Sequence, residues 1–299
     1  MATVSMLHPS GDQGSGSDAF HRAGKGSPLV LLHGANMSWR AWRPVLPFLT
    51  GRHDVYVPTM AGHRGGPVLG DGSDHGMTAV VDSLCDQLDA AGIETAHVAG
   101  NSLGGWAALE LARRGRARSV TAISPAGAWR SRRDLIRLLA MFRMARAAIG
   151  TPPLRALAAN PMLRSAWLGR VVEHPGRVST EDLAAMVEDA VGCSALSGAL
   201  SGRVQLHMIE PLDVAVCPIR VAWAEHDRTI PYRRYGHPMR ARIPGADFIT
   251  LPGVGHVPMS DDPRLVARTI LEMTSAVDEA AGQSRPRTRR KGSRARLSA

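Results

Sequence analysis

The stretch that decides the fold is "HVAGNSLGGWAALELARR", residues 97–114. A short apolar run leads into Gly-Asn-Ser-Leu-Gly at residues 100–104, and good helix formers follow. This pattern fits G-x-S-x-G, in which a sharp turn between a strand and a helix strains the serine backbone and lifts its hydroxyl clear of the sheet. Side chains at positions 100 and 104 would collide with the neighbouring helix and strand, so glycine is required at both. The stretch therefore predicts that Ser102 is a nucleophile at the end of a strand.

Strand and helix patterns alternate on both sides of this turn. Short apolar runs typical of buried strands occur at 28–34, 53–60, 95–100, 119–124, 218–224 and 246–251. Apolar residues at helical spacing occur at 77–92 and 264–277, and Gly92 supplies a stop signal for the first of these helices. Strands that are apolar on both faces and alternate with helices indicate an α/β fold with a mostly parallel sheet flanked by helices.

The region 128–208 interrupts this alternation, because it contains helical patterns and no convincing strand. We expect it to form an all-helical lid over the carboxyl ends of the strands. Ser179 or Thr180 is the expected N-cap of its last helix, which begins before Glu181 and Asp182. The expected segments are a loosely ordered N-terminal segment with at most a short strand near "AFHRAG", a core in two parts, the lid and a basic tail. Their bounds are 1–27 for the N-terminal segment, 28–127 and 209–284 for the core, 128–208 for the lid and 285–299 for the tail.

Length and composition are compatible with one large domain. The chain has 299 residues, of which 44% are hydrophobic, enough to bury a single α/β core. Its cysteines, Cys85, Cys193 and Cys217, are odd in number and widely spaced, which favours a reducing compartment over a disulfide framework or a metal site. The N-terminus lacks the basic start and apolar run of a secretory signal, and no stretch approaches the ~18 apolar residues of a membrane span. We therefore expect a cytoplasmic protein with no membrane span.

The positive charge of the chain is concentrated near its end. Residues 285–299 carry seven of the 36 Lys and Arg residues and no acid, which leaves 29 basic and 26 acidic residues, a net charge of +3. This tail has almost no apolar surface to bury, so we expect it to be disordered and solvated. Since it offers no aromatic side chain for base stacking, we expect little nucleic-acid binding.

A serine hydroxyl is a poor nucleophile until a base removes its proton, so the predicted turn needs a histidine nearby. His256, in "LPGVGHVPMSDDP", follows one predicted strand and precedes the last helix. Asp227, in "RVAWAEHDRTIP", stands just past another strand and is the candidate acid that orients the imidazole. The order Ser, Asp, His along the chain is the one expected of this arrangement. The alternative acids nearby are Glu225, Asp261 and Asp262.

Several further residues have candidate roles around the serine. His33, in a His-Gly pair, is expected to hold the following loop in place, and His226 is expected to be a loop residue. Asn101 either braces the turn or borders the substrate pocket. Trp39 and Trp106 flank the site in sequence, so each is a candidate for the pocket wall, although packing in the core is the alternative.

The chain resembles capped members of the α/β-hydrolase superfamily. The matching segments are "LVLLHGANMSW", "VAGNSLGGWAALELA", "VAWAEHDRTIP" and "GVGHVPMSDDP", which occur in the order and at the separations of that superfamily. The resemblance implies a catalytic triad of Ser102, Asp227 and His256. It also implies an oxyanion hole made by the backbone N–H groups of Ala35 and Leu103, which would stabilise the charge of a tetrahedral intermediate. The sequence departs from the pattern at its N-terminus, where the usual pair of first strands is barely visible.

These observations predict a serine hydrolase that cleaves a small carboxylic ester through an acyl-enzyme. No metal-ligand spacing is present, and the proposed chemistry requires neither a metal nor an organic cofactor. One alternative is a hydrolase that breaks a carbon–carbon bond in a ring-cleavage diketone, and another is a cofactor-free perhydrolase or acyltransferase. Haloalkane dehalogenases and epoxide hydrolases of this fold need an aspartate nucleophile, so Ser102 argues against both. The non-enzyme alternative is a ligand-binding protein that retains the pocket.

The predicted lid is also rich in positively charged residues. Residues 129–177 hold ten arginines against two acids, Asp134 and Glu173. One interpretation is a solvated basic face above apolar residues. The other is that one or two of these arginines bind an anionic group of the substrate in bidentate fashion, which would suit the diketone alternative.

Overall fold

The computed structural model describes residues 19–69, 76–149, 165, 168–195 and 208–283 of the 299. A seven-stranded sheet forms its centre, with the strand order β1-β3-β2-β4-β5-β6-β7. Strand β1 runs antiparallel to β3, whereas all other neighbouring strands are parallel. The strands are β1 (Phe20–Gly24), β2 (Ser27–Leu32), β3 (His53–Pro58), β4 (Ala96–Asn101), β5 (Ala117–Ile123), β6 (Ile219–Ala224) and β7 (Asp247–Leu251).

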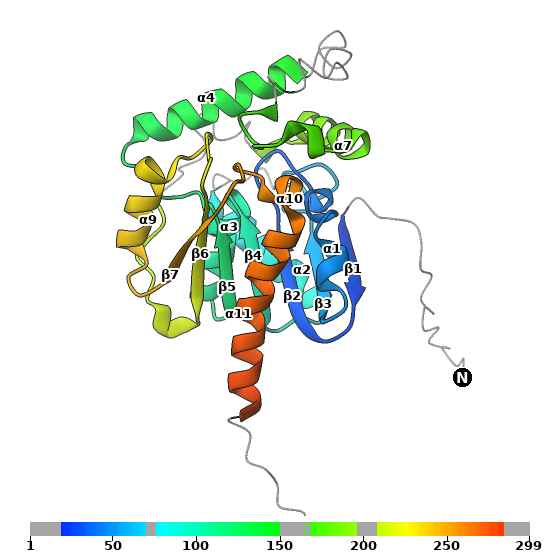
Figure 1. The fold of residues 1–299 in the computed structure, drawn as a ribbon, viewed down its shortest axis with the longest axis vertical. Helices are drawn as coiled ribbons and strands as arrows, with labels where there is room; N and C mark the ends of the chain where they lie inside the picture. The colour runs from blue at the N-terminus through cyan, green and yellow to red at the C-terminus, as the bar shows by residue number, and fades with distance from the viewer. Residues whose placement is uncertain (1–18, 70–75, 150–164, 166–167, 196–207, 284–299) are drawn as a thin grey trace, which may run out of the picture.

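Helices cover both faces of this sheet (Figure 1). Alternate residues of β2 show why, since Val30 and Leu32 belong to one buried cluster with residues of α2, α3 and α9, while Leu29 and Leu31 belong to a second cluster with residues of α1 and α11. Strands that are buried on both faces explain the continuous apolar runs in the sequence. These helices are α1 (Leu46–Leu49), α2 (Met77–Ala90), α3 (Leu103–Arg113), α9 (His237–Arg242) and α11 (Pro263–Gln283). The predicted mostly parallel sheet flanked by helices is confirmed.

The helical insertion lies between β5 and β6, as predicted. Its described helices are α4 (Arg132–Ile149) and α7 (Thr180–Gly192), which lie above the sheet in Figure 1. Ser179 is the N-cap of α7, because its hydroxyl accepts a hydrogen bond from the Asp182 N–H at 3.0 Å. Residues 150–164, 166–167 and 196–207 of the predicted lid lie outside the described residues, as does the basic tail 285–299.

The remaining short elements connect these layers. They are η1 (Trp39–Trp42), η2 (Pro175–Arg177), η3 (Val214–Val216), η4 (Tyr232–Gly236) and α10 (Pro258–Asp261). Strand β1 falls inside the segment 1–27 and is the short strand expected near "AFHRAG"; residues 1–18 lie outside the described residues. None of the three cysteines forms a disulfide. No described helix is both long and apolar enough to cross a membrane.

Candidate active site

The predicted nucleophile lies at the carboxyl ends of the parallel strands, an edge that we call the rim. Ser102 follows β4 and has φ 56° and ψ −113°, in the positive-φ region that non-glycine residues rarely adopt. A Cβ on Gly100 would lie 2.1 Å from the Gly104 carbonyl oxygen, and a Cβ on Gly104 would lie 2.3 Å from the Leu32 carbonyl oxygen. The expected need for glycine at both positions is therefore visible in the packing of α3 against β4 and β2.

His256 and Asp227 meet at the same rim. Each follows a neighbouring strand, β7 for His256 and β6 for Asp227. The His256 Nδ1–H donates to Asp227 Oδ2 at 2.7 Å, and both side chains are buried. The other oxygen, Oδ1, accepts the N–H groups of Thr229 at 2.9 Å and Ile230 at 2.8 Å. These bonds orient the carboxylate, so the imidazole keeps its proton on Nδ1 and presents the lone pair of Nε2.

The alternative acids have other partners. Glu225 Oε2 accepts the Gly253 N–H at 2.8 Å, and Asp262 Oδ1 accepts the N–H of Leu265 at 2.9 Å. The Asp261 carboxylate accepts three backbone N–H groups, those of Glu173, His174 and Gly255, at 2.7–3.0 Å. Asp261 thereby joins the base of the lid to the loop that carries His256. Of these four acids, only Asp227 forms a described hydrogen bond with the His256 imidazole.

Ser102 and His256 line one cavity between the rim and the lid. Its space is about 640 Å³, which includes an opening to solvent. Among the described contacts no hydrogen bond joins the two side chains. Hydrogen bonds between a nucleophile and its base are often long without substrate and tighten when substrate binds. The arrangement places a hydroxyl and an oriented imidazole at one wall of a cavity.

Of the two expected oxyanion-hole residues, Ala35 lines this cavity, whereas Leu103 follows the lining residue Ser102 and is not itself among the described residues that line it. Ala35 lies in the loop after β2, and Leu103 is the first residue of α3. Neither backbone N–H donates a hydrogen bond to a described residue. Asn36, next to Ala35, has φ 63°, so the loop turns sharply just after the expected donor. A helix N-terminus behind Ser102 adds a favourable electrostatic field for negative charge.

Two other histidines take the structural places expected of them. His33 is fully buried, with Nδ1–H donating to the Gly34 carbonyl at 2.8 Å and Nε2 accepting the Met60 N–H at 2.9 Å. Burial lowers the pKa of His33 well below its ordinary value, so the ring stays neutral and fixes the start of the loop that carries Ala35. His226 is half-exposed, and its Nδ1 lies 3.4 Å from Glu173 Oε1.

The three expected substrate contacts have different outcomes. Asn101 lines the cavity and also braces it, because its Nδ2 donates to the His256 carbonyl at 2.9 Å and to the Ile123 carbonyl at 3.3 Å. Trp106 packs edge-on against Trp129, with ring centroids 5.3 Å apart, and Trp39 stacks on His21 at 5.0 Å. Neither tryptophan is among the described residues that line the cavity.

The wall that the sequence did not identify is apolar and comes largely from the lid. Met37 lines the cavity from the loop after β2, and Val257 lines it from the loop that carries His256. The lid residues at the cavity are Phe142, Ala145, Leu168, Val171, Met186 and Ala190. Apolar residues at helical spacing on α4 and α7 indicate a buried face, but this spacing alone does not distinguish a face against a core from a face against a cavity.

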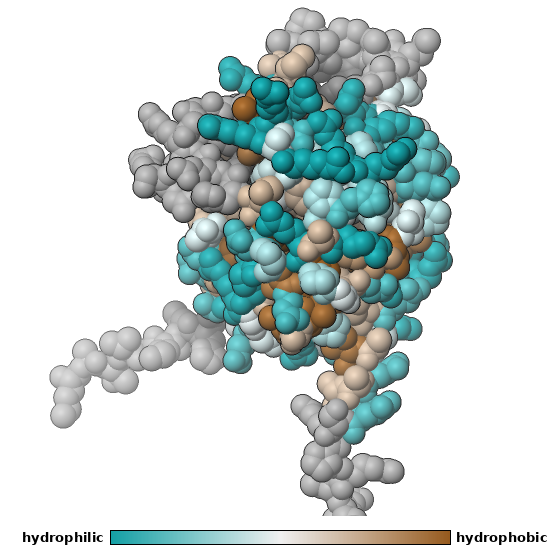
Figure 2. Space-filling model, turned by 90° about the vertical axis from the view of Figure 1, so that its left-hand side faces the viewer, coloured by the Kyte–Doolittle hydropathy of each residue, from teal (hydrophilic) through white to brown (hydrophobic). Residues whose placement is uncertain are grey.

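The lid arginines that the structure describes face solvent. Seven of the ten are exposed, and none of the seven lines the cavity: Arg130, Arg132, Arg133, Arg137, Arg143, Arg170 and Arg177. Figure 2 shows hydrophilic side chains gathered over the upper part of this face of the molecule, the level at which α4 lies in Figure 1. For these residues the solvated-face interpretation fits better. Within the described ranges, no group of three or more His, Cys, Asp or Glu side chains is arranged to hold a metal ion.

Comparison with known proteins places this geometry in context. Residues 29–269 match the family described as "Alpha/beta hydrolase family". A protein of Mycobacterium tuberculosis named epoxide hydrolase EphH is 35% identical over 209 residues, which are 67% of this chain and 94% of that protein. A 2-hydroxymuconate semialdehyde hydrolase of Pseudomonas sp. is 37% identical over 95 residues, covering 31% of this chain and 33% of that protein.

A solved structure shares the fold at lower identity. The thermophilic esterase of Thermogutta terrifontis superimposes with a TM-score of 0.65 and 22% identity, covering 87% of this chain and 93% of that one. Likeness at this identity supports the architecture and leaves the substrate open, because one fold hosts many activities. The family match, residues 29–269, spans the described site from Ala35 to His256. The chain belongs to the alpha/beta hydrolase family.

Proposed function

We propose that this hydrolase cleaves a small, neutral carboxylic ester through an acyl-enzyme on Ser102. The observation that carries the proposal is the His256–Asp227 hydrogen bond of 2.7 Å at the wall of the cavity that Ser102 also lines. An imidazole with its Nδ1 proton held by a carboxylate is suited to accept a proton on Nε2. The strained turn then presents a hydroxyl that this base can activate.

In the proposed reaction, the Ser102 Oγ attacks the ester carbonyl while its proton passes to His256 Nε2. The carbonyl oxygen becomes an oxyanion bound by the N–H groups of Ala35 and Leu103. Collapse of the intermediate breaks the bond to the alcohol, which leaves with the proton from Nε2. A water deprotonated by the same nitrogen then attacks the acyl-enzyme and releases the acid, which restores the Ser102 hydroxyl. Asp227 stays ionised and holds the imidazolium in place.

The cavity wall favours an uncharged acyl group. The lid side chains at the cavity are apolar, and no described lid arginine reaches it. A carboxylate placed against such a wall would lose its hydration without gaining donors. The second candidate, cleavage of a carbon–carbon bond in a diketone, is favoured by the similarity to the semialdehyde hydrolase. It uses the same triad, so only substrate preference separates the two.

The similarity to a named epoxide hydrolase raises a third substrate class. Attack of the Ser102 oxygen on an epoxide carbon would form an ether. An ether has no carbonyl for water to attack, so the enzyme would remain alkylated after one turnover. Ester cleavage avoids this difficulty because the acyl-enzyme is itself an ester. Serine at position 102 therefore supports the ester over the epoxide.

A substrate panel with a nucleophile variant tests the proposal. It comprises p-nitrophenyl esters from acetate to octanoate, a dienoic diketone bearing a carboxylate, and styrene oxide, each with wild type and Ser102→Ala. We expect a short-chain ester to have the highest kcat/KM and Ser102→Ala to lower it by about 10³-fold or more. A higher kcat/KM for the diketone or the epoxide would contradict the proposal. So would a Ser102→Ala variant that keeps wild-type turnover.

A further inference from the structure

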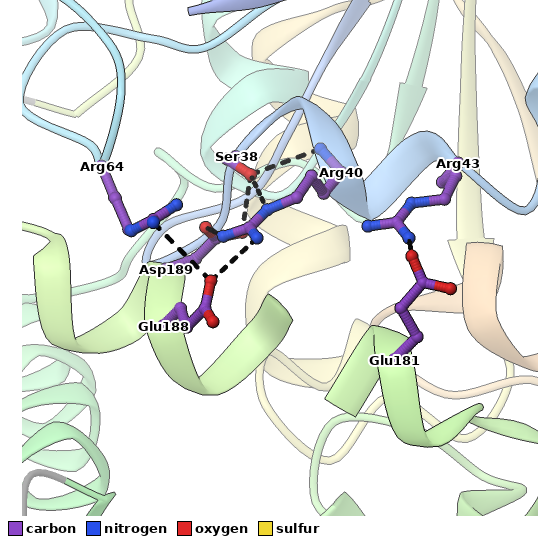
Figure 3. A network of polar contacts seen from close by, with 7 residues as sticks. All are labelled: Ser38, Arg40, Arg43, Arg64, Glu181, Glu188 and Asp189. Atoms are coloured by element: carbon purple, nitrogen blue, oxygen red, sulfur yellow. Dashed lines mark hydrogen bonds and ion pairs between the residues drawn. The ribbon is translucent and has the colours of Figure 1, made fainter. Parts of the chain in front are cut away.

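One carboxylate of the lid is buried against the core. Asp189 lies on α7 and is 2% exposed. Its Oδ2 accepts a hydrogen bond from the Ser38 Oγ–H at 2.6 Å, and its Oδ1 is paired with the Arg40 guanidinium. Figure 3 shows these side chains converging from α7 and from the segment around η1. A charge is rarely buried in this way unless partners satisfy both of its oxygens.

The partners of Asp189 stand immediately after the oxyanion loop. Ser38 is the N-cap of η1, because its Oγ accepts the Arg40 backbone N–H at 3.3 Å. Since Ser38 gives its single hydroxyl proton to Asp189, its lone pairs are left to accept from Arg40. The lid carboxylate thereby fixes the orientation of the cap. Ala35, the expected oxyanion donor, is three residues upstream, and Asn36, with φ 63°, lies between them.

The same helix also forms part of the cavity wall. Met186 and Ala190, which are four residues apart on α7 and so share a face of the helix, both line the cavity, and Asp189 lies between them in sequence. The loop that bears Ala35 and the wall that would meet the acyl group are thus joined through one buried side chain. The contact fixes α7 against η1, because Asp189 binds both the Ser38 hydroxyl and the Arg40 guanidinium. Ser38 is the N-cap of η1, and Arg40 lies within η1.

We propose that Asp189 is a positioning residue: the lid carboxylate aims the Ala35 N–H by holding the Ser38 cap and Arg40. The inference rests on the proposed function, because it assigns a task to the oxyanion hole of that reaction. Asp189 does not touch the reacting atoms and acts through the loop. Its loss therefore lowers the rate of the chemical step and changes substrate binding little.

A second ion pair on the same helix provides the matched control. Glu181 on α7 pairs with Arg43, which follows η1, but the side chain of Glu181 is 78% exposed. Exposed pairs of this kind contribute little to stability. Both acids link α7 to residues in or next to η1. Only Asp189 is buried, and of the two acids only Asp189 contacts the N-cap residue Ser38.

The experiment compares Asp189→Asn and Glu181→Gln in the full chain. It measures kcat and KM on p-nitrophenyl butyrate, the rate constant for labelling of Ser102 by a neutral fluorophosphonate, and the thermal midpoint. We expect Asp189→Asn to lower both kcat and the labelling rate about 10-fold, with KM within about threefold. Glu181→Gln should stay within about twofold on every rate. If Asp189→Asn does not fold, Ser38→Ala carries the test, with a fall of kcat in the same direction.

The outcomes separate this inference from the proposed function. If wild type labels and turns over while Asp189→Asn matches it within twofold, Asp189 has no positioning role and the ester-hydrolase proposal stands. A rise of KM with unchanged kcat would also overturn the inference, since it would make α7 a binding wall only. A wild type that neither labels nor turns over any ester would refute the proposed function, and the inference with it.

Discussion

The rim of the sheet and the lid position side chains around one cavity by different means. At the rim, Ser102 is set by backbone conformation, with φ 56° and two glycines that leave no space for a Cβ. In the lid, Asp189 is set by side-chain contacts with Ser38 and Arg40. No other residue can replace a glycine where a Cβ has no space, whereas a side-chain contact can be weakened gradually. We therefore expect changes at the rim to abolish function or folding and changes in the lid to reduce rates by modest factors.

Among the changes that test this difference between rim and lid, we expect the largest loss of activity at Asp227. In Asp227→Asn the amide no longer accepts the Nδ1–H in the way the carboxylate does, so the imidazole proton shifts toward Nε2 and the base is lost. We expect kcat to fall about 10³–10⁴-fold on a short-chain ester at pH 7. Steady-state kinetics with active-site titration measures this.

The control for that variant is Glu225→Gln, which changes an acid of the same loop that accepts the Gly253 N–H and lies 3.9 Å from His226 Nε2, without a hydrogen bond to His256. It should keep kcat within about threefold. Similar losses in both variants would mean that the loop, rather than the oriented imidazole, limits the reaction.

The next effect tests the backbone of the rim directly. In Gly104→Ala, the new Cβ would lie 2.3 Å from the Leu32 carbonyl oxygen. This oxygen belongs to the backbone of β2, so no side-chain rotation relieves the clash. Because α3 must move away from β2, we expect the free energy of unfolding to fall by about 3 kcal/mol or more. Urea denaturation followed by circular dichroism measures the change.

Gly51→Ala is the matched substitution, since a Cβ there meets nothing within 4 Å. We expect it to change the free energy of unfolding by no more than about 0.5 kcal/mol. A Gly104→Ala protein as stable as Gly51→Ala would show that the turn is not held by close packing.

The smallest effect concerns the pH dependence of stability. Burial lowers the pKa of His33 well below 6.5, and it also lowers the pKa values of His53 and His97. A histidine of lowered pKa binds fewer protons folded than unfolded. Its contribution to stability is therefore complete above its ordinary pKa of about 6.5 and is lost as the pH falls below that value.

His63 opposes part of this trend. Burial is the largest single influence and would lower its pKa, but the hydrogen bond and charge interaction with Cys193 and the backbone hydrogen bonds to Ala61 and Met60 together outweigh burial and leave the pKa raised. Burial also lowers the pKa of His21. With four histidines shifted down and one up, we expect the free energy of unfolding to be lower at pH 5.5 than at pH 7.5. Urea midpoints at the two pH values check this. Equal or higher stability at pH 5.5 would mean that these rings are not held neutral.

Local pattern was enough to predict the rim. Gly100, Ser102 and Gly104 fall within five residues, so steric need is readable from spacing alone. Asp227 and His256 were found because each follows an apolar strand, and parallel strands bring such positions to one edge. The strand β1 was barely readable, because it lies at the sheet edge and three of its five residues are exposed.

The lid was predicted as a helical insertion, but its contacts were not. Asp189 follows Glu188 on an amphipathic helix, and nothing in the sequence indicates that one of the two acids is buried on Ser38 while the other is half-exposed. Trp106 was considered for the cavity because it is four residues from Ser102, yet its ring packs on Trp129. Proximity in sequence does not say which face of a helix meets a cavity.

The most direct test of the central claim is a crystal structure of the protein after reaction with a neutral fluorophosphonate. We predict phosphorus bonded to the Oγ of residue 102, with the phosphoryl oxygen about 2.7–3.1 Å from the N–H nitrogens of Ala35 and Leu103. The Nε2 of His256 should face the phosphonate ester oxygen. An unmodified serine, or an adduct whose phosphoryl oxygen points away from both nitrogens, would contradict the account.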